Sequence, residues 1–283
     1  MNIGIIGLGL IGGSLGRSIL KNTSHKVYGK DVNKDVLVKA KLLRAITTEL
    51  SEQDYKNLDI LFVATNPAVA VDIITEACPK LSAGTIVIDC CGTKKVVVEC
   101  MQQLKNQYTD LYFLGGHPMA GREFSSINHS VSNLFDRAYF LIVPVKANIK
   151  ILAKIKELLL SIGCLNMVVT TEAKHDELIS YTSQLAHIVS SCYIKNPLYN
   201  QHVGYSAGSF RDMTRVAKLN PTMWTELMLE NKENLITQIE DIEKHLEEYK
   251  IALQNDDNSE LFRLLDEGNT LKAEADKLHR QGV

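Results

Sequence analysis

The chain has 283 residues, of which 45% are hydrophobic and 23% charged, and its formal net charge is -2. This composition is typical of one large globular domain or two ordinary ones, and the small net charge excludes a general electrostatic attraction to nucleic acid. The longest apolar run, from Ile3 to Leu15, is broken by five glycines and has no cleavage-like site behind it, so we expect neither a signal peptide nor a membrane span.

The six cysteines show neither a CxxC pair nor a spacing suited to metal ligands. We therefore expect no metal site. Cysteines without such patterns are typical of reduced thiols in a cytoplasmic protein.

In residues 1–169, short apolar runs alternate with helical patterns. The predicted strands are 2–6, 26–30, 60–65, 85–89, 111–114, 139–143 and 165–169, and the clearest predicted helices are 11–21, 34–44, 68–81 and 94–107. Near-continuous apolar strands alternating with helices predict an α/β fold with a parallel sheet covered on both faces. In this doubly wound, Rossmann-type architecture, ligands bind at the carboxyl ends of the strands.

The first strand leads into a glycine-rich turn. IGIIGLGLIGGSLG places Gly7, Gly9 and Gly12 in G-x-G-x-x-G spacing, with Leu10 and Ile11 opening the helix. The first glycine makes the tight turn, the second lets the backbone approach a pyrophosphate, and the third lets the helix pack closely on the strand. The alternative is a buried turn without a ligand, but a strand precedes the motif and a helix follows, so we predict a bound dinucleotide.

Asp31 lies nineteen residues after Gly12, at the end of the second predicted strand. A carboxylate there can accept hydrogen bonds from an adenosine ribose and repels a 2′-phosphate, which favours NAD over NADP. The alternative is that Asp31 caps the helix over 34–44. Thr65, Asn66 and Pro67, at the end of the third predicted strand, either line the cofactor groove or form a simple turn.

The stretch LGGHPMAGREF puts a histidine after a strand. We predict that the strand ends at Leu114, and that Gly115 and Gly116 keep its end free of side chains so that a nicotinamide and a substrate ring can approach. Pro118 restricts the backbone of His117 toward an extended conformation. An imidazole at this position is a candidate general base.

From Thr170 onward the strand signal disappears, so residues 170–283 are predicted to be helical. In a helix from about Thr171, the apolar positions are expected to form the core face: Leu178, Leu185, Val189 and Cys192. A second stripe is polar and small, and we interpret it as the wall of a cleft with His187 pointing inward: Asp176, Ser180, Gln184, His187 and Ser191. The alternative is a histidine at a helix–helix contact.

The segment SFRDMTRVAKLNPTMW places Arg211 and Arg215 four residues apart on a helix, with Asp212 able to orient the Arg215 guanidinium. Such a fixed fork suits a carboxylate substrate, although an ordinary surface ion pair is the alternative. Trp224 is expected in the core.

We predict one helix from Pro221 to about Gln254, about 50 Å long. Its apolar residues follow a heptad-like spacing: Leu235, Ile239, Ile242, Leu246, Tyr249 and Leu253. We expect this helix to pack against a second copy of the chain in a homodimer. The alternative is a helix folded over the first domain.

With these residues in view, the chain resembles the prephenate/arogenate dehydrogenase family of tyrosine biosynthesis. GGHPMAG, HDELISYTSQLAH and FRDMTRVAKLNPTMW occur in the family's order and spacing over nearly the whole chain. The resemblance implies an NAD-binding domain over 1–169 and a helical dimerisation and substrate domain over 170–283. It also implies oxidative decarboxylation of prephenate to 4-hydroxyphenylpyruvate, or of arogenate to tyrosine.

The resemblance further assigns roles to residues. His117 matches the catalytic histidine, His187 a substrate-contacting histidine, Arg215 the arginine that binds a substrate carboxylate, and Glu123 an acidic residue at the cleft mouth. Two positions depart from the family pattern. Gly92, followed by Thr93, stands where a serine is frequent, and Gln184 stands where many relatives carry a histidine; Thr93 and Gln184 are retained as candidate substrate contacts.

Two other functions remain open from the sequence. A 3-hydroxy-acid dehydrogenase would also combine a nucleotide-binding domain with a helical one, but it usually relies on a lysine in the helical half, and Lys174 and Lys195 lie off the polar stripe. A redox-sensing NAD-binding protein leaves His117, His187 and Arg215 unexplained as a set. The choice between prephenate and arogenate, tyrosine feedback and the strictness for NAD are not encoded in these motifs.

Overall fold

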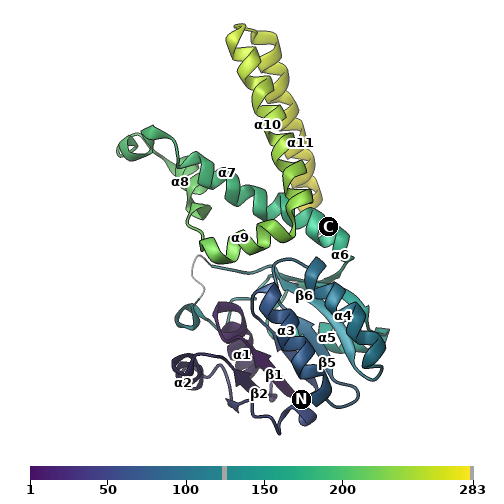
Figure 1. The fold of residues 1–283 in the computed structure, drawn as a ribbon. Helices are drawn as coiled ribbons and strands as arrows, with labels where there is room; N and C mark the ends of the chain where they lie inside the picture. Colours follow the sequence, from purple (N-terminus) through teal and green to yellow (C-terminus); the bar gives the residue numbers. More distant parts are fainter. Residues whose placement is uncertain (123–125, 281–283) are drawn as a thin grey trace. The chain divides into compact units, whose positions relative to one another are not determined.

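The computed structural model describes residues 1–122 and 126–280. The chain forms two compact units, Met1–Lys232 and Glu233–Val283. The first unit contains a sheet with its flanking helices, followed by a series of shorter helices (Figure 1). The second unit contains two long helices.

The first unit is built on one eight-stranded sheet in the order β3-β2-β1-β4-β5-β6-β7-β8. Its strands are β1 (Asn2–Ile6), β2 (Lys26–Lys30), β3 (Thr48–Glu49), β4 (Ile60–Val63), β5 (Ile86–Asp89), β6 (Tyr112–Pro118), β7 (Tyr139–Lys146) and β8 (Asn166–Val169). The predicted doubly wound fold is confirmed. One detail is wrong, because β7 runs antiparallel to β6, so the sheet is not wholly parallel.

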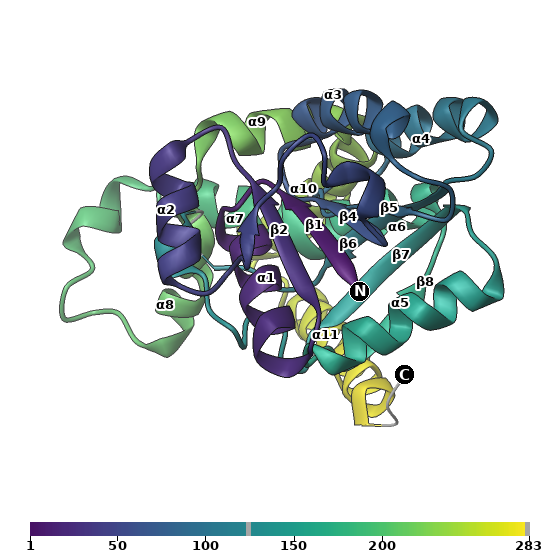
Figure 2. The same ribbon diagram turned by 90° about the horizontal axis from the view of Figure 1, so that it is seen from below.

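Helices cover both faces of the sheet. They are α1 (Leu10–Asn22), α2 (Lys34–Leu42), α3 (Pro67–Ala77), α4 (Lys95–Gln107) and α5 (Ile149–Ser161). Helices α3 and α4 lie on one face and α1 and α5 on the other (Figure 2). Alternate strand residues point to opposite faces, so Ile60 and Phe62 join one buried core while Leu61 and Val63 join the other.

Strand β6 does not end at Leu114, as the glycines had suggested, but continues through Pro118. Its parallel neighbour β5 pairs with it only as far as Leu114. The antiparallel β7 supplies partners beyond that point, including Leu141 opposite His117. The last residues of β6 therefore extend past the end of β5, and His117 is held in an extended backbone at this open edge.

The remaining helices of the first unit are α6 (Glu172–Ile179), α7 (Ala186–Tyr193), α8 (Gly208–Thr214) and α9 (Pro221–Glu230). A π-helical turn over Ser180–Leu185 joins α6 to α7. The core face expected for this stretch is partly wrong: Leu178 is exposed, as is Cys192, while Ser180 and Gln184 are buried. The polar residues can be buried because they form hydrogen bonds within the protein.

The single helix predicted from Pro221 to Gln254 is wrong. It is interrupted at Asn231, so that α9 ends at Glu230 and α10 spans Lys232–Gln254. The buried Asn231 side chain donates to the backbone carbonyl of Asp176 and to the Gln184 side chain, each at 2.8 Å. Asparagine is a weak helix former whose amide readily forms bonds of this kind instead of supporting a helix.

In the second unit, α10 and α11 (Asn258–Arg280) run side by side (Figure 1). A short turn joins them, with Asp256 at a φ of 49° and the Asp257 carboxylate accepting from the backbone N–H of Glu260 at 3.0 Å. No helix within residues 1–122 and 126–280 is long and apolar enough to cross a membrane.

Replacing Gly12 by alanine should destabilise the protein. A Cβ at this position would lie 1.9 Å from the Gly7 carbonyl oxygen, and backbone must move to relieve that contact. We expect the free energy of unfolding, measured by urea denaturation, to fall by about 1–3 kcal/mol. The control is Gly268→Ala in α11, where no atom lies within 4 Å and a gain of about 0.5–1 kcal/mol is expected. Equal stability of Gly12→Ala and the unmodified protein would contradict the close packing.

Candidate functional site

The glycine-rich turn has the geometry that its spacing predicts. Gly7 has a φ of 87°, in the left-handed region that favours glycine, and its N–H donates to the Lys30 carbonyl at 2.9 Å. Gly12 packs directly on the Gly7 carbonyl. Gly9 occupies the N-cap of α1 and offers no side chain to the first turn. The start of α1 can therefore present backbone N–H groups to an anion.

Asp31 lies beside this turn at the end of β2. Its carboxylate accepts from the backbone N–H groups of Leu8 at 2.8 Å and Asn33 at 2.9 Å. The residue at the N-cap of α2 is Asn33, whose side chain accepts from the Asp35 N–H. Asp31 is therefore not the helix cap, and its carboxylate is fixed against the glycine turn instead.

Thr65, Asn66 and Pro67 follow the end of β4 at the same edge of the sheet. Pro67 opens α3, with Asn66 at its N-cap. Thr65 is close to the glycine turn, because a Cβ on Gly7 would lie 2.8 Å from its methyl group. The segment is thus both the start of a helix and a neighbour of the dinucleotide-type turn.

A buried ion pair lies at the end of β5. Lys94 and Asp89 form a salt bridge, and both side chains are fully buried. Asp89 also accepts from the backbone N–H groups of Cys91 at 2.9 Å and Gly116 at 3.0 Å. The pKa of Lys94 is lowered by burial and raised by Asp89, and it lies above its ordinary value in balance.

The two glycines before His117 pack closely against this ion pair. A Cβ on Gly116 would lie 2.4 Å from the Asp89 carbonyl oxygen, and one on Gly115 would lie 3.1 Å from the Lys94 side chain. Both glycines are buried. The space beside them is occupied by Asp89 and Lys94, so the prediction that they leave an open approach for ligands is wrong.

His117 itself is half-buried at the carboxyl end of β6. Its Nδ1 lies 2.9 Å from Nε2 of His175, on α6. His175 is buried, and its Nδ1 lies 2.6 Å from the Asp176 carboxylate. Burial lowers the pKa of His117 well below its ordinary value, and the nearby His175 and Lys94 lower it further. The imidazole is therefore neutral at neutral pH and can act as a base.

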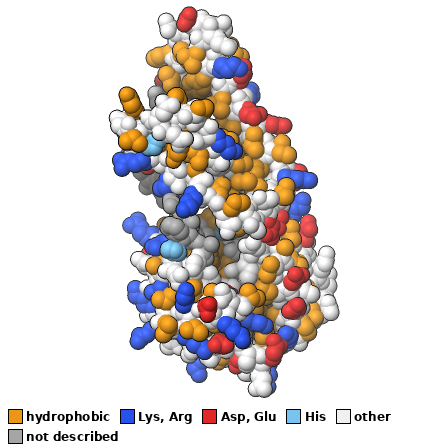
Figure 3. Space-filling view, turned by 60° about the vertical axis from the view of Figure 1, so that its left-hand side comes forward, with side chains coloured by type: hydrophobic (Ala, Val, Ile, Leu, Met, Phe, Trp, Pro, Cys, Tyr) orange, Lys and Arg blue, Asp and Glu red, His pale blue; other side chains and the backbone are white. Residues whose placement is uncertain are grey.

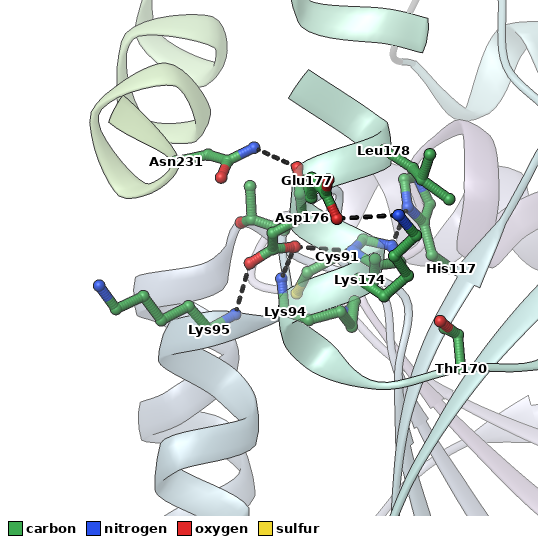
Figure 4. Close-up of polar contacts among 12 residues, drawn as sticks. Cys91, Lys94, Lys95, His117, Thr170, Lys174, Asp176, Glu177, Leu178 and Asn231 are labelled. Atoms are coloured by element: carbon green, nitrogen blue, oxygen red, sulfur yellow. Dashed lines mark hydrogen bonds and ion pairs between the residues drawn. The ribbon is translucent and has the colours of Figure 1, made fainter. Parts of the chain in front are cut away.

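Asp176 connects several elements (Figure 4). Its carboxylate accepts from the backbone N–H groups of Lys94 at 2.9 Å and Lys95 at 3.0 Å. Sequence reasoning placed Asp176 on a cleft wall and missed the roles of Lys94 and His175. The only signal was the His-Asp pair within HDELISYTSQLAH.

His187 and Arg215 belong to a second part of the site. The Nδ1 of His187 lies 2.9 Å from the Val216 carbonyl, and its ring packs on Trp224 with centroids 4.2 Å apart. Arg215 directly precedes Val216 and is exposed at the start of a 3-10 turn, Arg215–Ala217, after α8. The structure thus brings these two candidates together. Trp224, which was expected in the core, is only partly buried and packs on His187.

The two positions that depart from the family pattern are buried and bonded within the protein. Gln184 donates from Nε2 to the Leu227 carbonyl at 2.9 Å, and its Oε1 accepts from Asn231. The Thr93 hydroxyl donates to the Glu230 carboxylate at 2.5 Å. A Cβ on Gly92 would meet the Leu227 methyl groups at 3.3 Å. Glu123 lies outside the described residues.

Two family models match this chain. One, described as the nucleotide-binding domain of prephenate dehydrogenase, matches residues 15–168, and the other, described as its dimerization domain, matches residues 171–267. The chain belongs to the prephenate dehydrogenase family.

Relatives support this assignment along the whole chain. The prephenate dehydrogenase of Lactococcus lactis subsp. cremoris is 29% identical over 287 residues, which cover 98% of this chain and 77% of that protein. The crystal structure of prephenate dehydrogenase from A. aeolicus with hydroxyphenyl propionate and NAD+ has a TM-score of 0.84 at 28% identity, covering 97% of this chain and 98% of the other. Synechocystis arogenate dehydrogenase gives 0.81 at 26% identity, with 97% and 100% covered.

Replacing Lys94 by methionine should leave the Asp89 carboxylate buried without its cation. Removing one partner of a buried pair typically costs about 3–5 kcal/mol, so we expect a loss of that order in the free energy of unfolding. The matched control is Lys174→Met, since Lys174 pairs with Glu177 at 2.9 Å in solvent and an exposed pair contributes about 0–1 kcal/mol. Similar losses for the two variants in chemical denaturation would refute a special contribution from the buried pair.

Proposed function

We propose that this chain is an NAD-dependent dehydrogenase that converts prephenate to 4-hydroxyphenylpyruvate by oxidative decarboxylation. The observation that carries the proposal is the position of His117 at the carboxyl edge of the sheet, where the glycine turn also lies, with its Nδ1 held by His175, in a chain of this family. The A. aeolicus relative is named for the same activity and was crystallised with NAD+ and hydroxyphenyl propionate, a molecule with a phenol and a carboxylate.

The residues around the glycine turn fit a dinucleotide. The close contact of Gly12 with Gly7 brings the start of α1 against β1, and Gly9 leaves that start uncovered by a side chain. The Asp31 carboxylate is positioned for ribose hydroxyls and would repel a 2′-phosphate. These residues support NAD as the cofactor, with Leu10, Ile11, Thr65, Asn66 and Pro67 alongside it.

The chemistry that bound NAD would supply is acceptance of a hydride from the ring carbon that carries the substrate hydroxyl. In our proposal His117 accepts the hydroxyl proton at Nε2, because its Nδ1 is engaged by His175. As the carbonyl develops, the ring carboxylate leaves as carbon dioxide, and formation of the aromatic ring drives the reaction. Arg215 binds a substrate carboxylate.

His187 presents its second nitrogen to the substrate side chain, since Nδ1 is held by the Val216 carbonyl. Gln184 and Thr93 were candidate substrate contacts, but their polar atoms are bonded to Leu227, Asn231 and Glu230. We therefore propose that both residues stabilise the structure around the site and do not contact the substrate directly.

The family's dimerization domain and the exposed apolar residues of this region support a homodimer. Leu246 and Leu253, on the heptad-like stripe of α10, are each 62% exposed, and Tyr205 is 94% exposed. Hydrophobic side chains reach the surface at several places on this helical part of the chain (Figure 3). A surface with many exposed apolar residues is typical of a site of protein–protein interaction.

The activity can be tested by NADH formation with prephenate and with arogenate in parallel. We expect turnover of prephenate, and His117→Asn should lower kcat by about 100-fold or more while NAD affinity is retained. Because burial lowers the pKa of His117, the activity should persist as the pH falls below 6.5 and disappear only when that lower pKa is reached. Turnover of 3-hydroxy acids alone, or near-normal kcat in His117→Asn, would refute the proposal; turnover of arogenate alone would correct the substrate.

The dimer can be tested by light scattering on the purified protein. We expect a mass of twice 31.5 kDa. The double variant Leu246→Lys and Leu253→Lys should give a single chain, because like charges on the stripe oppose its burial. Glu247→Lys, an exposed position off the stripe, is the control and should remain dimeric. A single chain for the unmodified protein would exclude the dimer.

A further inference from the structure

His117, His175 and Asp176 form a continuous chain of hydrogen bonds that runs from the carboxyl end of β6 into the protein. The two links measure 2.9 Å between the imidazoles and 2.6 Å between His175 and the carboxylate. Relative exposure is 1% for His175 and 4% for Asp176. The three side chains contact each other directly, and the innermost group is the Asp176 carboxylate, which accepts a hydrogen bond.

The Asp176 carboxylate is oriented by its own donors. The backbone N–H groups of Lys94 and Lys95, at the start of α4, donate to its two oxygens. An ionised carboxylate can only accept hydrogen bonds, so His175 must donate to it from Nδ1. A neutral imidazole protonated at Nδ1 carries its lone pair on Nε2.

The hydrogen bond between the two imidazoles has a fixed direction for the same reason. Nε2 of His175, carrying a lone pair, must accept from His117, so the proton of His117 is on Nδ1. Nε2 of His117 then carries a lone pair that can accept a proton. The carboxylate thus sets the tautomers of both histidines in turn.

We propose that His175 and Asp176 are positioning residues that hold His117 in the Nδ1–H tautomer and receive its proton during the reaction. The inference rests on the proposed function for the identity of the substrate. In the proposed step, the substrate O–H bond breaks and an N–H bond forms at Nε2 of His117. The Nδ1 proton of His117 passes to Nε2 of His175, so the positive charge lies on the imidazolium next to Asp176.

The charged groups around the pair favour this transfer. His117 is close to Lys94, whose ammonium disfavours a second positive charge there. Asp89 neutralises Lys94 through their salt bridge and contacts the β6 backbone at Gly116. His175, by contrast, is in direct contact with the Asp176 carboxylate. A proton on His175 is therefore paired with a negative charge, whereas a proton kept on His117 is not.

The tautomers can be read without any substrate. Nitrogen-15 spectra of the histidine-labelled protein at pH 7.5, assigned with His117→Asn, should show His117 protonated at Nδ1. In His175→Leu, where the acceptor is lost, His117 should revert to the Nε2–H form that an unconstrained imidazole favours. An Nε2–H form of His117 in the unmodified protein would overturn the inference, whether or not prephenate is a substrate.

Kinetics on two matched variants separate positioning from simple structural support. His175→Gln keeps a carbonyl that can accept from His117, and His175→Leu does not. We expect kcat to fall by about 100-fold or more in His175→Leu and by less than about tenfold in His175→Gln, with KM for substrate and NAD little changed in both. His245→Leu, at an exposed histidine of α10, is the control and should match the unmodified enzyme. Equal losses in the two His175 variants, or no loss in either, would overturn the role.

Discussion

The candidate site depends on the hydrogen bonds that the Asp176 carboxylate accepts. Its oxygens receive two backbone N–H groups from the start of α4 and one imidazole from α6. Its own backbone carbonyl receives the Asn231 side chain, where α9 ends. One residue therefore fixes the sheet domain, the first helix of the helical segment and the helix break with respect to each other. The orientation of the His117 base at the carboxyl end of β6 depends on these elements being held together.

The buried Asp89–Lys94 pair supports the same site from the sheet side. Asp89 receives the Gly116 N–H and the Lys94 ammonium, and Lys94 in turn fills the space beside Gly115. The absence of side chains at these two glycines thus serves close packing of β6 on this pair. The polar interior costs desolvation, but it places charge next to His117, and the neutral base follows from that environment.

The glycine-rich nucleotide turn could be predicted from the local spacing of residues in the sequence. Gly7 and Gly12 adopt the predicted geometry because a tight turn and a close helix–strand contact depend on residues a few positions apart. The family, too, could be identified from three motifs in order. The end of β6 could not be predicted, because its last residues pair with β7, which lies more than twenty residues away and runs in the opposite direction.

The inner part of the site was missed for a related reason. His175 gains its importance from a contact with His117, 58 residues earlier, and Lys94 from burial against Asp89. Nothing in the local pattern distinguishes such a histidine or lysine from one on the surface. The helix break at Asn231 likewise arises from side-chain bonds to Asp176 and Gln184 that only the folded chain provides.

The role of His117 as the base at the reacting hydroxyl can be tested by a crystal structure with NAD+ and 4-hydroxyphenylpyruvate. We expect the product's ring hydroxyl within about 3 Å of Nε2 of His117 and facing the nicotinamide, a hydrogen-bond distance suited to proton transfer. A hydroxyl bound away from His117, with another side chain at that distance, would contradict it.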